Sequence, residues 1–219
     1  RGLGDVYKRQ VLTGVNIGDY GMKSENGQVE RFSSFFNLLK TIEGYEYSRR
    51  IRISSIEPNL LSDQIIKFFS NSRVFVPHFH IPLQSGSDRI LKDVRRRYSS
   101  SEYLDIVFNI KDLMPEASIP SDVIVGFPGE SDSEFLPTID VVAKAQLSTV
   151  HIFPYSKRPG TSAFYSKSHV QDHVIKERSK DLLSLVDKLS GVAKKSLIGK
   201  ERSILWEGKS KASVSYTHL

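Results

Sequence analysis

The stretch SDVIVGFPGESDSEFLPTIDVVAKA, residues 121–145, decides the fold class. In its first part, Ser121–Phe127, every second residue from Val123 onward is a large apolar one, and this period of two predicts a strand with one buried face. Ser133–Ala145 then predicts a helix, in which Pro137 is tolerated only if it lies in the first turn. A strand that leads directly into a helix is the unit of a parallel sheet, because neighbouring parallel strands need a crossover connection.

The same alternation continues on both sides of this stretch. Four further runs predict strands, namely Val11–Thr13, Arg50–Ser55, His78–Gln84 and Thr149–Tyr155. The segments between them predict helices at Phe32–Ile42, Asp63–Phe69, Asp88–Arg95 and Ser99–Leu113. Ser62, Ser87 and Ser99 are the expected N-caps, and Ser99 with Glu102 has the spacing of a capping box. The fold class is therefore α/β with parallel strands, either as a barrel or as an open sheet.

The character of the sequence changes at Gln171. Apolar residues at helical spacing predict one long helix from there to about Lys195, and Gly199 ends it. Ile204–Trp206 then predicts the start of a β module. The expected parts are a non-native leader at 1–10, an incomplete barrel at 11–170, a helix at 171–198, a truncated second domain at 199–212 and a non-native tail at 213–219.

Composition excludes several classes of protein. The chain has 219 residues, 39% of them hydrophobic, so disordered and collagen-like classes do not fit. No run approaches the roughly 18 consecutive apolar residues that a membrane helix needs, and the N-terminus has no apolar signal core. There is no cysteine, which excludes disulfides, cysteine zinc sites and any thiolate-held iron–sulfur cluster made by this chain alone.

The net charge of +6 comes with clustered basic residues. The clusters are Arg49, Arg50 and Arg52; Arg95, Arg96 and Arg97; Lys157 and Arg158; and Lys194, Lys195, Lys200 and Arg202. Basic residues from separate elements can converge on one face, and a polyanion such as RNA is then a reasonable partner. An ordinary solvated surface explains the same charge, so a non-catalytic RNA-binding domain is one of the functions that the residues leave open.

The loops after the predicted strands are the natural site, because ligands bind at the carboxyl ends of parallel strands. Glycines follow four of these five ends and allow a close approach of a ligand or of another backbone. The loops contain Thr13–Gly14, Ser54–Pro58, Gln84–Ser87, Val125–Glu130 and Pro154–Thr161. Any one of these loops is more often a turn than a site, but five on one rim indicate a binding site.

Two histidines suggest a metal site as an alternative. His78 and His80 are two apart on a predicted strand and point the same way, and Asp122 and His151 could complete the ligands of a metal-dependent barrel hydrolase. The other interpretation is a pair of hydrogen-bonded interior histidines. Polar residues inside a barrel are costly unless they are hydrogen-bonded or contact a ligand.

Four segments in this order, RISSIEP, HIPLQSGSDRILKDVRRRYS, SDVIVGFPGE and HIFPYSKRPGT, resemble the radical S-adenosylmethionine (SAM) methylthiotransferases that act on tRNA. The resemblance implies a radical-SAM, TIM-like α/β barrel followed by a TRAM β-domain. Val11–Gly14 with Asn16, and the segment FPYSKRPGT, resemble the branch acting on threonylcarbamoyladenosine beside the anticodon. The isopentenyladenosine branch is the close alternative.

The family's cofactors are SAM and 4Fe–4S clusters, and the SAM-cleaving cluster is held by a CxxxCxxC motif that this sequence lacks. The resemblance therefore implies an enzyme as the full-length parent and an inactive fragment of it here, with no metal ligand in this chain. By resemblance, the SAM-contacting residues are Thr13, Gly14, Glu57, Gln84, Ser85, Arg96, Ile124 and Gly126, and Lys157 and Arg158 contact tRNA phosphates. Of these, Arg96 is expected to grip the α-carboxylate of SAM, and Gly126 to leave room for the adenine. The family further implies a reductant as partner, a cytoplasmic monomer and no membrane association.

Overall fold

The computed structural model describes residues 9–14, 16–25, 28–31, 33–45 and 50–202. The strands within these ranges are β1 (Arg9–Leu12), β2 (Met22–Glu25), β3 (Gln28–Arg31), β4 (Arg50–Ile53), β5 (Ser121–Val125) and β6 (Val150–Pro154). The α-helices are α1 (Phe35–Glu43), α2 (Asp63–Asn71), α3 (Asp88–Asp93), α4 (Ser100–Leu113), α5 (Asp132–Lys144) and α6 (Asp172–Lys195). The predicted α/β alternation is confirmed, and α6 is the long helix expected from residue 171 onward.

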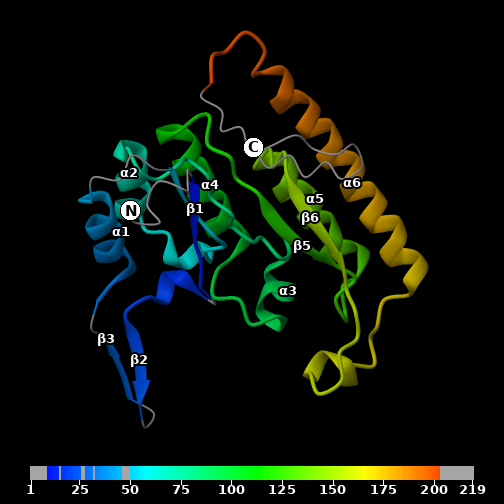
Figure 1. Ribbon diagram of the computed structural model, residues 1–219. Coiled ribbons are helices and arrows are strands. Elements are labelled where there is room, and N and C mark those ends of the chain that lie inside the picture. The colour runs from blue at the N-terminus through cyan, green and yellow to red at the C-terminus, as the bar shows by residue number, and fades with distance from the viewer. Residues whose placement is uncertain (1–8, 15, 26–27, 32, 46–49, 203–219) are drawn as a thin grey trace, which may run out of the picture.

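The strands form two parallel pairs, β1 with β4 and β5 with β6. An extended segment, residues 74–84, joins the pairs through parallel bridges from Phe75 to Ile51 and from Gln84 to Val123. Together these elements make one curved parallel surface, and α1, α2, α4, α5 and α6 lie around its outer side (Figure 1). All carboxyl ends of the parallel strands therefore lie at the same end of the molecule.

The segment His78–Gln84 is not the regular strand that its alternation predicts. It forms only isolated bridges, although Ile81 N–H donates to the Pro120 carbonyl at 3.0 Å and His80 accepts from Ile56 N–H at 3.0 Å. Pro82 has no N–H to donate, and Gln84 has a φ of 63°, so a continuous ladder cannot form. The segment is nevertheless extended and has the place of a strand between β4 and β5.

The first strand begins earlier than predicted. β1 starts at Arg9, two residues before the expected Val11, and pairs in register from Arg9–Arg50 to Leu12–Ile53. Arg9 and Gln10, which belong to the expected non-native leader at 1–10, are thus part of a paired strand. The remaining residues of the expected leader, the β module beginning at Ile204 and the expected tail lie outside the described residues.

The β2–β3 hairpin was not among the predicted elements. It is an antiparallel pair in which Glu25 lies opposite Gln28. The hairpin extends away from the parallel strands (Figure 1). The dipeptide Asn26–Gly27 between its strands is the strongest short-range signal of a two-residue hairpin turn, and it could have been recognised in the sequence.

Helix starts follow their local signals closely. Ser62, Ser87 and Ser99 accept hydrogen bonds from the first turns of α2, α3 and α4, and Ser99 with Glu102 forms the predicted capping box. Pro137 differs from the prediction, because α5 begins at Asp132 and the proline is its sixth residue. There the helix packs against Gly86, where any side chain would overlap the Pro137 carbonyl. The Pro137 carbonyl thus lies at a close contact between α5 and the loop before α3.

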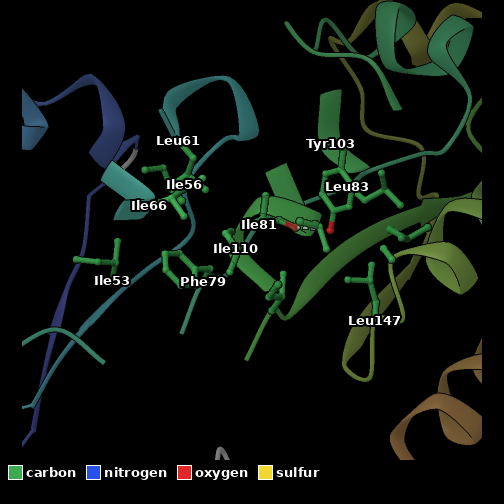
Figure 2. Close-up of a cluster of buried hydrophobic side chains, with 14 of the residues drawn as sticks. Ile53, Ile56, Leu61, Ile66, Phe79, Ile81, Leu83, Tyr103, Ile110 and Leu147 are labelled. Carbon is green, nitrogen blue, oxygen red and sulfur yellow. Dashed lines mark hydrogen bonds between the residues drawn. The ribbon is translucent and has the colours of Figure 1, made fainter. Parts of the chain in front are cut away.

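The core lies between the outer face of the strands and the helices. Figure 2 shows part of it, including Ile53, Ile66, Phe79, Ile81, Leu83, Ile110 and Leu147. Tyr103 is fully buried, and its hydroxyl donates to the Ile81 carbonyl at 3.3 Å and lies 3.2 Å from Ser121 Oγ. Along β5, Val123 and Val125 are buried while Asp122 and Ile124 are half-buried. One face of each strand therefore belongs to the core, and the other face, called the inner face below, is open to a ligand.

Candidate functional site

Glu57 and Arg96 are brought together at the carboxyl ends of the strands. Glu57 follows β4 as the residue before a short 3-10 helix, and Arg96 follows α3. Arg96 Nη1 donates to Glu57 Oε1, and both side chains keep a little over a quarter of their surface, 29% and 27%, exposed. Arg96 Nε is buried and has no hydrogen-bond partner among the described residues. The pair is partly exposed, and Glu57 takes one of the five N–H donors of Arg96, so donors remain for a charged ligand.

Gln84 has a left-handed backbone that is unusual for a side chain of its size. Its φ is 63°, and its backbone N–H donates to the Asp122 carbonyl at 2.7 Å while its carbonyl accepts from Ile124 N–H at 2.8 Å. Such a conformation costs about 1–3 kcal/mol and persists only where the surroundings hold it. The two bonds to β5 hold it here, which fixes the turn from the extended segment into the loop before α3.

Ser85 faces away from the inner face. It is 1% exposed, and its Oγ lies 3.5 Å from Thr138 Oγ1 on α5 and accepts from Ser87 N–H at 3.2 Å. That Ser85 approaches SAM stays a prediction, and its buried side chain leaves only its backbone for such a contact. The Ser85 hydroxyl thus interacts with polar groups of a buried loop that packs against α5.

Gly126 was expected to make room for an adenine, and the structure gives a different reason for the glycine. Its φ is +81°, which disfavours a side chain, and a Cβ at this position would overlap the Ile175 side chain of α6. Gly126 N–H also donates to Glu130 Oε2 at 2.7 Å. The glycine therefore allows α6 to pack closely over the end of β5.

A buried ion pair fixes α6 to the same loop. Arg178 Nη1 donates to Glu130 Oε2 at 2.9 Å and to the Glu130 carbonyl at 3.0 Å, and Arg178 Nη2 donates to Asp132 Oδ1 at 2.7 Å. The Arg178 and Glu130 side chains are 8% and 0% exposed. Burial raises the pKa of Glu130, and the Gly126 N–H and the Arg178 charge oppose that rise. Residue patterns did not predict this pair, because its partners are 48 positions apart.

The other predicted residues lie at the same end of the strands without such contacts. Thr13 and Gly14 follow β1 and are exposed. Ile124 lies half-buried on the inner face of β5. Lys157 and Arg158 follow β6 in an exposed loop, and neither forms an ion pair with any described residue. Both cations are therefore available to an external anion.

The metal-site hypothesis is not supported by the side-chain geometry. His80 Nε2 lies 3.0 Å from Asp122 Oδ1, and His80 Nδ1 lies 2.8 Å from Ser55 Oγ, so both ring nitrogens are engaged. His151 lies edge-to-face with His80 at 6.0 Å between ring centroids, and His78 is buried. Within the described ranges, no three histidine, aspartate or glutamate residues are placed to hold a metal ion. The interpretation as hydrogen-bonded interior histidines is correct for His80.

Three residues of the inner face were not among the predicted SAM- or tRNA-contacting residues. Ser55 is a partner of His80, Phe153 of β6 is 51% exposed, and Arg52 of β4 is half-buried. Burial and the nearby Arg9 charge lower the pKa of Arg52. The alternation in β4, where Ile51 and Ile53 are buried, is the signal that could have placed Arg52 on this face.

A separate groove lies at the edge of β6. It has a volume of about 570 Å³ and is lined by Val150–Pro154 together with Ser179, Lys180 and Leu183 of α6. None of the predicted cofactor residues contributes to it. The groove is therefore distinct from the rim that carries Glu57 and Arg96.

Comparison with known proteins agrees with this geometry. Residues 27–142, just over half of the chain, match the model of the radical SAM superfamily. The chain belongs to the radical SAM superfamily. A similar fold is found in the radical SAM methyltransferase TsrM from Kitasatospora setae, whose structure holds cobalamin and a [4Fe–4S] cluster. The TM-score is 0.57 at 10% sequence identity, and the match covers 73% of this chain and 30% of that one.

Curated relatives narrow the family further. The chain is 41% identical to the threonylcarbamoyladenosine tRNA methylthiotransferase of Thermotoga maritima over 92% of its own length and 45% of the relative's. It is 37% identical to the tRNA-2-methylthio-N(6)-dimethylallyladenosine synthase of Paenarthrobacter aurescens over 94% of its own length and 39% of the relative's. The resemblance to radical-SAM tRNA methylthiotransferases is thereby confirmed, and the chain spans less than half the length of these relatives.

Membership of the superfamily implies SAM and a 4Fe–4S cluster as cofactors. The residues fit SAM, because the half-exposed Arg96 has a buried Nε without a partner among the described residues and lies beside Glu57. The chain contains no cysteine, so it supplies no thiolate ligand to a cluster. No helix in the described part of the chain is both long and apolar enough to cross a membrane.

Proposed function

We propose that this chain is part of an enzyme that transfers a methylthio group to C2 of the adenine of threonylcarbamoyladenosine in tRNA. The observation that carries the proposal is 41% identity over 92% of the chain to a transferase of that name. The second candidate is the isopentenyladenosine-type reaction, because relatives named for it are 37% identical over a similar share of the chain.

In this proposal, Arg96 and Glu57 hold the methionine part of SAM. Arg96 has five N–H donors, of which Glu57 takes one, so the remaining ones can hold the α-carboxylate by two parallel hydrogen bonds. The Glu57 carboxylate can accept from the ligand's amino or ribose hydroxyl groups. The rest of the rim around the methionine part of SAM contributes mainly backbone groups and the shape of the surface. It consists of Thr13, Gly14, Gln84, Ile124 and Gly126.

The tRNA partner is assigned to the basic loop after β6. Lys157 and Arg158 are exposed and free of ion pairs with described residues, so they can neutralise phosphates of the anticodon region without first breaking a contact. The proposal further includes a reductant as a partner, the cytoplasm as the location of the reaction, a monomeric enzyme and a TRAM domain beginning near residue 199.

Nucleoside analysis of tRNA tests the proposal. The full-length gene that encodes this chain is expressed in a bacterial strain lacking its own methylthiotransferases, and digested tRNA is examined by mass spectrometry. We expect 2-methylthio-N6-threonylcarbamoyladenosine, with a large loss for Arg96→Met and none for Arg97→Met, whose side chain is exposed. Formation of only the methylthiolated isopentenyladenosine would favour the second candidate, and no methylthiolated nucleoside would contradict both.

The same experiment separates an enzyme from a non-catalytic RNA-binding domain. A binding domain would retain tRNA through Lys157 and Arg158 and leave every nucleoside unmodified. In the enzyme, Lys157→Ala should weaken tRNA binding in a salt-dependent way while SAM binding stays unchanged. Equal effects of Lys157→Ala and Arg96→Met on SAM binding would count against the assigned roles.

A further inference from the structure

Three side chains from three successive strand segments form a hydrogen-bonded chain on the inner face. Ser55 follows β4, His80 lies in the extended segment, and Asp122 lies in β5. Ser55 Oγ is 2.8 Å from His80 Nδ1, and His80 Nε2 is 3.0 Å from Asp122 Oδ1. We call this the Ser55–His80–Asp122 chain.

This chain differs from the buried polar groups of the core. The hydroxyls of Tyr98 and Tyr103 bond to main-chain carbonyls inside the core and stabilise the fold. In contrast, His80 and Asp122 keep 18% and 20% of their side-chain surface exposed, and Ser55 is exposed. Polar atoms that bond to one another and still face an open surface are available to a ligand.

The hydrogen bonds define which groups the chain presents. Asp122 is an acceptor, so the proton on His80 is at Nε2, and Nδ1 then accepts from the Ser55 hydroxyl. Ser55 Oγ and the second oxygen of Asp122 are left to accept from an N–H. The Ser55–His80–Asp122 chain can therefore accept a hydrogen bond from a donor on a heterocycle, such as the N6–H of an N6-substituted adenine.

An aromatic surface lies beside this polar one. In the register of β5 with β6, Asp122 pairs with His151 and Ile124 with Phe153, so all four share one face. The Phe153 ring is 51% exposed. A planar base can stack on an exposed aromatic ring while its edge bonds to the neighbouring polar atoms, and such stacking is worth about 1–3 kcal/mol per base.

The position of the Ser55–His80–Asp122 chain along the strands suits the binding of a substrate. His80 precedes Gln84 by four residues and Asp122 precedes Ile124 by two, so the chain lies below the rim assigned to SAM. A strand rises about 3.3 Å per residue, so Asp122 and His80 lie about 7 and about 13 Å below the rim along their strands. A base held there lies on the same inner face as the rim assigned to the cofactor.

We propose that the Ser55–His80–Asp122 chain accepts a hydrogen bond from the N6–H of the target adenine and that Phe153 stacks on its ring. The inference rests on the proposed function, which supplies adenosine as the substrate class, and it assigns His80 and Asp122 to that substrate and not to a metal ion. Because both N6-threonylcarbamoyladenosine and N6-isopentenyladenosine keep the N6–H, both should use these contacts.

The test is nucleoside binding to the 219-residue chain, followed by NMR of its histidine side chains. We expect the His80 imidazole signals to shift as either nucleoside is added. His80→Leu should raise Kd about 10-fold and Ser55→Ala about threefold for both nucleosides, which is the effect of losing one or two hydrogen bonds. His173→Gln is the matched control, because His173 is exposed on α6, and it should leave Kd unchanged.

The outcomes separate this inference from the proposed function. Equal binding of the nucleosides to the wild type, His80→Leu and Ser55→Ala would overturn the inference, and so would the absence of binding to the wild-type chain. Thermal unfolding checks that each variant is folded, and Ser55→Ala keeps the test valid if His80→Leu unfolds. The tRNA nucleoside analysis is independent: methylthiolated tRNA together with unaffected nucleoside binding would reject the inference alone.

Discussion

Two arginine–glutamate pairs lie near the carboxyl ends of the strands, and burial makes them different. Arg178 and Glu130 are almost completely buried, at 8% and 0% exposure, whereas Arg96 and Glu57 are 29% and 27% exposed. The buried pair also bonds to the Glu130 carbonyl and to Gly126 N–H. Its hydrogen bonds therefore connect α6 to the β5 loop, while the half-exposed pair keeps donors for a ligand.

This comparison shows that a motif can combine residues with separate tasks. The segment SDVIVGFPGE, expected to contact the cofactor, holds Gly126 and Glu130, and both of these contact α6. The segment that ends in Arg96 carries the accessible charge. Resemblance alone assigned these segments to one site, whereas burial assigns Glu130 to the packing of α6 and leaves Arg96 accessible to a ligand.

The largest expected effect is on the buried pair. Arg178→Met keeps the alkyl stem but leaves the Glu130 carboxylate buried without its cation, and breaking a buried pair in this way costs about 3–5 kcal/mol. Urea unfolding should show this loss. The matched substitution at the accessible pair, Arg96→Met, should cost less than about 1 kcal/mol, because exposed pairs contribute little. Similar losses for the two variants would contradict the division.

The next effect is at the glycine that α6 covers. Gly126→Ala adds a methyl group that overlaps Ile175 at a positive φ, and we expect a loss of about 2–4 kcal/mol. Gly160→Ala is the control, since its φ is +84° but nothing lies within 4 Å of a Cβ there. That variant should lose only about 1–2 kcal/mol, the cost of the backbone conformation. Equal losses in thermal unfolding would mean that α6 does not restrict Gly126.

A smaller effect is the pH dependence from Glu130. Burial raises its pKa in the folded chain, so the folded state binds a proton there more readily than the unfolded state. The stability of the wild type relative to Glu130→Gln should therefore be greatest below the ordinary glutamate pKa of about 4.3 and decline as the pH rises through the raised value. Urea unfolding of both proteins from about pH 4 to about pH 7 measures this difference. A difference that is constant with pH would contradict the assignment.

Local signals in the sequence were sufficient for much of the fold. The serine caps and the strand–helix alternation depend on neighbours within a few residues, and they predicted α2, α4, β5 and β6 to within about two residues. The extended segment before Gln84 was predicted less well, because proline and a positive φ interrupt its ladder while the alternation remains.

The site was predicted only in part, for a different reason. Glu57 and Arg96 could be placed by resemblance, and they do meet. The true neighbours of Ser85 and Gly126 lie on α5 and α6, about 50 positions further along the chain, and no local pattern encodes such contacts. The partnership of Ser55 with His80 likewise depends on the packing of separate strands.

The most direct test of the central claim, that the Arg96–Glu57 pair is the ligand-binding one, is binding of S-adenosylhomocysteine to the 219-residue chain. Ligand-observed NMR suits the weak affinity expected of a chain without cluster ligands. Arg96→Met should weaken binding at least about 10-fold, since a charge-assisted contact is lost, while its unfolding midpoint stays close to that of the wild type. Arg97→Met should bind as the wild type does. Unchanged binding by Arg96→Met would contradict the account.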